Sequence, residues 1–359
     1  MPSRSVSAGG ASAYLAVPKN GAGPGVVLFD GTDALADWLA GDGYVVLNTT
    51  AGTDEGLAAL RAAPGLSGKV AAVGFGSGAA RAVAAAGAGS VACAVSYYGD
   101  EAANLRDAAG RNGVPVMFHL ADDQADAIDK LKGRFPEVEA FFYRGVARGF
   151  AGGTAYNKSA ASLAYTRTLE LLRRHLGPRY DLDKIWDRHT ELEFAARAAE
   201  ETMGTMTAEP YVNHVPMMTG GTGWNEVLRF YKHHFIPTSP KDSSLVPISR
   251  TTGADRIVDE MLFCFTHDVE IDWMLPGIRP TGKYVQIPLV AIVRFQGDKV
   301  YGEHIYWDQA SVLVQIGLLD PKLYPTAGVE TAKKAFDENL PSNTLMGRWR
   351  ESANKGGGR

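Results

Sequence analysis

The chain has 359 residues and a formal net charge of −4, with 45% hydrophobic and 21% charged residues, a composition typical of a globular protein with room for two domains. The absence of a basic block argues against nucleic-acid binding, and no apolar run reaches the roughly 20 residues of a membrane-spanning helix. Because the first residues lack an apolar signal core, we expect a cytoplasmic protein without a membrane partner. We expect Cys93 and Cys264 to be reduced core residues.

Short apolar runs alternate with helical stretches in the first half of the chain. We predict strands over 13–17, 25–29, 44–47, 70–75, 92–98, 114–120 and 138–143, and helices over 54–63, 78–86, 122–131 and 160–175. This alternation predicts an α/β fold with a mostly parallel sheet covered on both faces.

Residues 70–79 have the strand-turn-helix pattern of a nucleophile elbow without its nucleophile. In the frame Gly-x-nucleophile-x-Gly, Gly74 and Gly78 are the flanking glycines, and Gly76 takes the nucleophile position. Ser77 comes one residue later, where its hydroxyl points away from that position. The pattern therefore predicts a hydrolase scaffold that lacks its catalytic nucleophile.

The first half resembles the dienelactone hydrolases, an α/β-hydrolase family, in the stretches 14–18, 25–28, 43–47, 97–99, 148–150 and 166–170. The resemblance implies a cysteine where Gly76 stands and a catalytic histidine where Arg148 stands. A guanidinium cannot serve as a general base. We therefore expect the first half to be structural, with its old pocket small or filled and with Arg148 paired to Asp122 or Asp123. The alternative is an ester or lactone hydrolase that uses Ser77.

Aromatic and titratable residues concentrate in the second half, which holds five of the six tryptophans and six of the eight histidines. Such groups gather where small molecules bind. The Gly177-Pro178 step indicates a linker, so we predict a first domain over 1–178, a second domain with the active site over 179–332, and a C-terminal tail over 333–359.

The second half begins with helical stretches at 182–206 and 223–234, separated by a loop at 209–214. Three strands are predicted at 256–267, 284–295 and 300–308. Helices followed by antiparallel strands are typical of an α+β fold.

This half resembles the SnoaL-like polyketide cyclases of the nuclear-transport-factor-like cone fold, in the stretches 211–214, 276–283, 292–295, 303–309 and 315–319. The resemblance implies a curved antiparallel sheet around a deep apolar cone with a few polar groups. It also implies an acid/base aspartate on the last strand, a position that Asp308 occupies, and a capping loop that carries His214.

Alternation along the last strand places His304, Tyr306 and Asp308 on one face, and Glu303, Ile305 and Trp307 on the other. The first row either projects into a pocket, or forms a solvent-facing edge or a hydrogen-bonded network. We take the pocket interpretation. Asp308, His304 and His214 are then the catalytic candidates. The substrate-binding candidates are Tyr211, Tyr231, Glu260, Asp272, Trp273 and Tyr306. Glu260 could instead pair with Arg294, and Trp273 could be a lid or an aromatic anchor.

The leading hypothesis is a cofactor-free enzyme that performs acid/base chemistry, as a cyclase, isomerase, hydratase, hydrolase or lyase, on an apolar small molecule in the cone. The alternative is a small-molecule binding or assembly protein. No His-x-His, His-x-x-x-His or Cys-x-x-Cys spacing occurs, so we expect neither a metal nor another cofactor. Strands 256–267 and 284–295 are apolar on both faces, which predicts a homodimer or larger homo-oligomer. Either the second half of another copy or the first domain would cover the outer face of the sheet.

Overall fold

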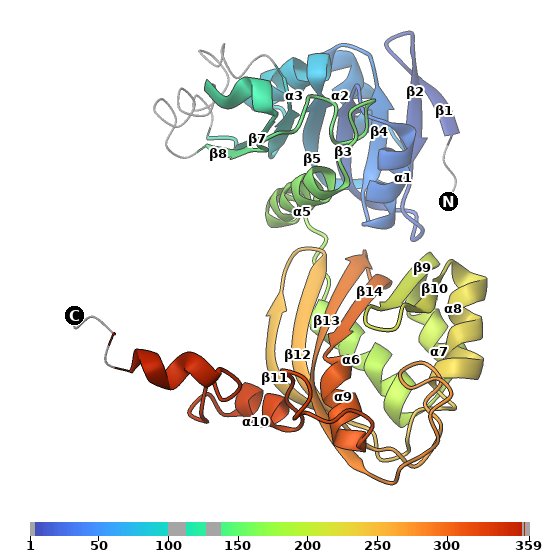
Figure 1. Ribbon diagram of the computed structural model, residues 1–359. Helices are drawn as coiled ribbons and strands as arrows, with labels where there is room; N and C mark the ends of the chain where they lie inside the picture. Colours follow the sequence, from blue (N-terminus) through green and yellow to red (C-terminus); the bar gives the residue numbers. More distant parts are fainter. Residues whose placement is uncertain (1–3, 100–112, 127–137, 354, 356–359) are drawn as a thin grey trace. The chain divides into compact units, whose positions relative to one another are not determined.

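The computed structural model describes residues 4–99, 113–126, 138–353 and 355. The chain divides into two compact units, Met1–Tyr180 and Asp181–Arg359, and the division falls two residues after the expected boundary at 178 (Figure 1). The predicted helix 122–131 lies partly outside the described residues. None of the helices in the described ranges is long and apolar enough to cross a membrane.

Unit 1 contains an eight-stranded sheet in the order β1-β2-β4-β3-β5-β6-β7-β8. Strands β3 to β8 pair in parallel, whereas β1 and β2 are antiparallel additions at one edge. The strands are β1 (Arg4–Ala8), β2 (Ala11–Ala16), β3 (Gly23–Phe29), β4 (Val45–Thr49), β5 (Leu66–Phe75), β6 (Ala94–Tyr97), β7 (Val116–Leu120) and β8 (Glu139–Phe142). Strand β1 was not predicted from the sequence.

Helices cover both faces of this sheet, as expected for a parallel α/β fold (Figure 1). Along β3, Val26 and Leu28 belong to one apolar core, and Val27 and Phe29 belong to the other. The helices are α1 (Asp33–Gly41), α2 (Thr53–Arg61), α3 (Ala79–Gly87) and α5 (Lys158–His175). The structure confirms the α/β fold class, and α1 is an addition to the predicted elements.

The turn from β5 into α3 is the predicted elbow. Gly76 has a φ of +52°, which is strained for any residue with a side chain. A Cβ atom on Gly78 would lie 2.2 Å from the carbonyl oxygen of Phe29, so this position also requires glycine. The hydroxyl of Ser77 donates a hydrogen bond of 2.5 Å to Asp30, which also pairs with Arg81.

Unit 2 contains a six-stranded sheet in the order β10-β9-β14-β13-β12-β11, in which only the β9–β14 pair is parallel. The strands are β9 (Met206–His214), β10 (Thr219–Thr222), β11 (Ser244–Thr252), β12 (Arg256–Thr266), β13 (Tyr284–Gln296) and β14 (Lys299–Trp307). The three long strands lie where they were predicted. The segment 209–214 belongs to strand β9, so its prediction as a loop is wrong.

The helices of unit 2 are α6 (Leu182–Thr190), α7 (Ala199–Gly204), α8 (Trp224–Phe230), α9 (Gln309–Ile316) and α10 (Glu330–Phe336). Two π-helical segments interrupt the predicted helices: η4 (Glu191–Ala195) follows α6, and η5 (Tyr231–Phe235) follows α8. The unit is therefore the expected α+β fold with a mixed rather than a purely antiparallel sheet.

The two faces of this sheet have different surroundings. On the face called inner here, side chains of β12, β13 and β14 meet α6, η4 and η5 around a cavity. On the opposite, outer face, Leu262 and Cys264 pack with Ala332 of α10. Further along that face, Val258 and Tyr306 are 39% and 40% exposed. Helix α10 of the same chain therefore covers part of the outer face and leaves the rest open.

Candidate functional site

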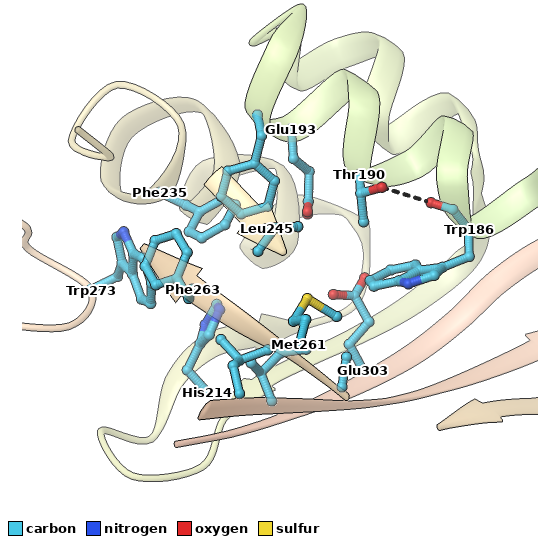
Figure 2. A pocket seen from close by; sticks show the side chains of 14 residues that line it. Trp186, Thr190, Glu193, His214, Phe235, Leu245, Met261, Phe263, Trp273 and Glu303 are labelled. Atoms are coloured by element: carbon cyan, nitrogen blue, oxygen red, sulfur yellow. Dashed lines mark hydrogen bonds between the residues drawn. The ribbon is translucent and has the colours of Figure 1, made fainter. Parts of the chain in front are cut away.

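The cavity on the inner face of unit 2 has a volume of about 40 Å³, room for only a few water molecules (Figure 2). The deep apolar cone that the resemblance implies is therefore corrected to a narrow, mostly aromatic and aliphatic cavity. Its lining residues are Trp186, Thr190, Glu193, Phe194, His214, Phe235, Leu245, Met261, Phe263, Trp273, Leu289, Ala291, Glu303 and Ile305.

Two carboxylates enter this cavity from opposite sides, Glu193 from the helical side and Glu303 from strand β14 (Figure 2). Both meet the imidazole of His189, whose Nε2 lies 3.2 Å from Glu193 Oε1 and 3.1 Å from Glu303 Oε1. The hydroxyl of Tyr231 donates to Glu303 over 3.2 Å and lies 3.3 Å from His189 Nε2. We call His189, Glu193, Tyr231 and Glu303 the polar cluster.

Burial of the polar cluster is nearly complete. His189 is 0% exposed, Tyr231 1%, Glu303 3% and Glu193 6%. Ionisable groups are rarely buried to this degree unless they are paired or bind a metal ion, because their desolvation is costly. The ligand atoms of His189, Glu193 and Glu303 all lie within 4.8 Å of one another, so these three residues could hold a metal ion.

The local sequence explains how helices present this cluster. Asp181 caps α6 by accepting from the backbone N–H of Lys184, and the buried residues Leu182, Trp186 and His189 follow at helical spacing. Glu193 comes four residues after His189, within the π-helical segment η4, and Tyr231 begins the π-helical segment η5. Such segments occur frequently at functional sites.

A second layer of contacts fixes the ring of His189. Its Nδ1 lies 2.6 Å from the hydroxyl of Thr205, and that hydroxyl donates its proton to the carbonyl oxygen of Thr202. Thr205 can therefore only accept from the ring, so Nδ1 carries a proton and Nε2 is the nitrogen that faces the carboxylates. The indole of Trp186 stacks on the ring at 5.5 Å and donates to the buried carboxylate of Asp259.

Electrostatics set the protonation of the cluster. Burial alone would lower the pKa of His189, but the carboxylates of Glu193 and Glu303 outweigh it and raise the pKa to about 10. Burial raises the pKa of the Glu193 carboxyl, and His189 only partly opposes this shift. Burial also raises the pKa of Tyr231 well above its ordinary value, so its hydroxyl stays neutral.

His214 lies on the wall of the same cavity, at the end of β9. Burial lowers its pKa to about 4, although Glu303 opposes the shift, so the ring is neutral at pH 7. Its Nδ1 has no hydrogen-bond partner among the described residues. The aromatic rings around it belong to Phe230, Phe235, Trp273 and Trp307. A neutral imidazole in this apolar wall is available to a ligand.

The structure corrects the expected orientation of strand β14. Glu303 and Ile305 line the cavity, and alternation therefore turns His304 and Tyr306 to the outer face. His304 contacts Tyr211 and Tyr306 there. Asp308 is exposed and caps α9 by accepting from the backbone N–H of Ala310 at 3.0 Å, which is a structural task.

The remaining sequence-predicted residues divide between the two sides of the sheet. Trp273 lines the cavity and Tyr231 belongs to the polar cluster. Tyr211 lies on the outer face, as does Glu260, which accepts from Ser249 at 2.7 Å. Asp272 bonds to His234 at 2.6 Å and does not line the cavity. Tyr211, Glu260 and Asp272 were expected to bind substrate, and this expectation is corrected because they lie outside the cavity.

Sequence reasoning missed His189 and Glu193 and assigned Glu303 to the wrong side. The available signals were the four-residue spacing from His189 to Glu193, which places both on one helix face, and a carboxylate in the otherwise apolar row of Glu303, Ile305 and Trp307. A buried charge within an apolar row needs a partner.

Unit 1 has a larger hollow beside its elbow, with a volume of about 290 Å³ and a lining that includes Phe75, Gly76, Ser77 and Tyr98. The expectation that the old pocket is small or filled is therefore wrong. Arg148 pairs with Asp123 over 2.7 Å, as predicted, although both side chains are well exposed. Gly76 brings no nucleophile into the hollow.

The comparisons with known proteins concern both units. Residues 48–176 match the model of the dienelactone hydrolase family. A protein of Azospirillum brasilense named as a carboxymethylenebutenolidase is 39% identical over 93 residues, a match that covers 23% of this chain and 40% of that relative. The chain therefore matches less than half of that relative's length.

Similar solved structures include a dienelactone hydrolase and a SnoaL-like polyketide cyclase. One is a dienelactone hydrolase of Klebsiella pneumoniae, with a TM-score of 0.40 and 18% identity over 47% of this chain and 95% of the other. Another is a SnoaL-like polyketide cyclase of Jannaschia sp. CCS1, with a TM-score of 0.30 and 15% identity over 40% of this chain and 99% of the other.

Proposed function

We propose that unit 2 is an enzyme that performs general acid/base chemistry on a small apolar molecule in its inner cavity, and that unit 1 is structural. One observation carries the proposal: the two carboxyl groups of the buried polar cluster and a neutral histidine with an unpaired Nδ1 line one apolar cavity. Perturbed ionisable groups that converge on a cavity are the physical signature of a reacting centre.

His214 is the proposed general base, because its ring is neutral at pH 7 and its Nδ1 is unpaired. A base with a pKa between roughly 4 and 5 is adequate when neighbouring donors stabilise the anion that forms. The polar cluster reaches the other side of the cavity through Glu193 and Glu303. Burial raises the pKa of the Glu193 carboxyl, which favours the protonated form that can donate toward a developing negative charge. Isomerisation, cyclisation, hydration and elimination all fit this arrangement.

The size of the cavity limits the substrate. With about 40 Å³ of free space, the cavity accepts the small reacting end of a molecule unless its aromatic wall moves. Phe194, Phe235 and Trp273 form much of that wall, and they select for an apolar surface next to the reacting atoms.

The hollow of unit 1 supports a second candidate, hydrolysis of an activated ester by Ser77. Its supporting observation is the position of the Ser77 hydroxyl, which lines the hollow and bonds to Asp30. The unit lacks a histidine base in the position that Arg148 occupies, so we rank this candidate second.

The test is a turnover screen of the full chain with small enols, unsaturated ketones, epoxides and hydroxy acids, followed by variants on the active substrate. We expect His214→Phe and Glu303→Gln to lower kcat/KM at least 100-fold, the usual contribution of a positioned acid or base. Asp308→Asn, on the exposed helix cap, is the matched control and should keep the wild-type rate. Binding without turnover, or equal rates in all three variants, contradicts the proposal.

A further inference from the structure

We propose that His189, Glu193 and Glu303 bind a divalent transition-metal ion such as Zn²⁺ or Mn²⁺. The inference deepens the proposed function, because the ion would lie beside the cavity in which we place the chemistry. Its support is independent of turnover, since it rests on the positions, burial and charge of three side chains.

The first argument is the spacing of the ligand atoms. His189 Nε2 lies 3.2 Å from Glu193 Oε1 and 3.1 Å from Glu303 Oε1. Charge-assisted hydrogen bonds between these groups are typically shorter, at about 2.7–2.9 Å. Ligands that lie roughly 2.0–2.2 Å from a common ion are about 3.0–3.5 Å apart, which is the range observed. Three oxygen atoms also surround Nε2, which can donate at most one proton.

The second argument is charge. The carboxyl groups of Glu193 and Glu303 are at most 6% exposed and lie in an apolar surrounding. A protonated His189 can offset one negative charge there, whereas one divalent cation beside a neutral His189 balances two. Buried charges are tolerated when they are paired or when they coordinate a metal. Imidazole and carboxylate ligands together suit Zn²⁺, Mn²⁺ and Fe²⁺.

The third argument is the layer of residues behind the ligands. Thr205 accepts the Nδ1 proton of His189 and thereby directs Nε2 toward the carboxylates, as metal-binding histidines usually require. Tyr231 donates to Glu303 and holds its carboxylate in place. Three protein ligands leave coordination positions open toward the cavity that Glu193 and Glu303 line. When bound, the ion would polarise an oxygen atom of the substrate.

The experiment uses the full chain, dialysed against a chelator and then titrated with Zn²⁺ and with Mn²⁺ in separate calorimetric runs. We expect one equivalent per chain with a submicromolar Kd for at least one ion, and a rise in Tm with ion concentration. Glu193→Gln should weaken binding at least 100-fold. Glu191→Gln is the matched control, because Glu191 lies in the same segment but is exposed and pairs with Arg188.

No heat of binding above the buffer blank for either ion would overturn the proposal. Equal affinity in Glu193→Gln and Glu191→Gln would do so as well, since the ion would then be at the surface. If Glu193→Gln does not fold by circular dichroism, Glu303→Gln with Glu260→Gln as its outer-face control replaces the pair. Metal binding without turnover would keep this inference and reject the proposed function, and full turnover in chelator would do the reverse.

Discussion

Acidification provides a sharp test of the environment of His214. In the folded chain burial lowers its pKa to about 4, against an ordinary value of 6.5. Between pH 6.5 and pH 4, His214 is therefore protonated in the unfolded chain but remains neutral in the folded chain. The stability linked to this group is fully present above pH 6.5, falls with pH, and is lost below about pH 4.

The magnitude follows from the shift. Each pKa unit corresponds to about 1.4 kcal/mol, so acidification from pH 7 to pH 5 should lower the free energy of unfolding by about 2 kcal/mol through His214 alone. Glu303 is the charged group that opposes this shift, and the rings packed around His214 belong to Phe230, Phe235, Trp273 and Trp307. Titrating groups that do not interact with His214 contribute equally to the wild type and to a variant without this imidazole.

The assay is urea unfolding of the full chain followed by tryptophan fluorescence, which reports mainly on unit 2 because five of the six tryptophans lie there. His214→Phe fits the aromatic surroundings and cannot titrate. We expect the difference in unfolding free energy between wild type and variant to change by about 2 kcal/mol between pH 7 and pH 5. An unchanged difference would refute a neutral, desolvated His214.

Two further predictions concern unit 1 and self-association. Ser77→Ala should leave hydrolysis of 4-nitrophenyl acetate by the full chain unchanged, because Gly76 holds the nucleophile position; a tenfold loss would restore the hydrolase alternative. We also expect a homodimer in sedimentation at micromolar concentration, formed through the open outer face of unit 2, where Val258 and Tyr306 are exposed. The double variant Val258→Lys, Tyr306→Glu should be a monomer. A monomeric wild type at the same concentration would contradict the prediction of a homodimer.

The fold was largely predictable because periodicity survives in the sequence. The three long strands of unit 2 and the parallel strands of unit 1 follow from apolar runs and alternation. Strand β9 was missed because it contains Pro210 and pairs with the glycine-rich strand β10. Proline and glycine weaken a strand pattern, whereas the tertiary pairing of β9 with β14 restores it.

The site was less predictable for a physical reason. Alternation shows which residues of β14 share a face, but the packing of α6, η4 and η5 determines which face is enclosed. The row of His304, Tyr306 and Asp308 is polar, and polar rows are usually solvated. Glu303 lies in the apolar row, and His189 reaches it from more than 100 residues earlier in the chain.

A crystal structure of the Glu303→Gln variant with a substrate of the wild-type enzyme tests the central claim most directly. The account predicts density in the inner cavity of unit 2, between His214 and the polar cluster, with Phe235 or Trp273 displaced to admit the molecule. Density on the outer face beside His304 and Asp308, or in the hollow beside Gly76 and Ser77 with an empty inner cavity, would contradict it.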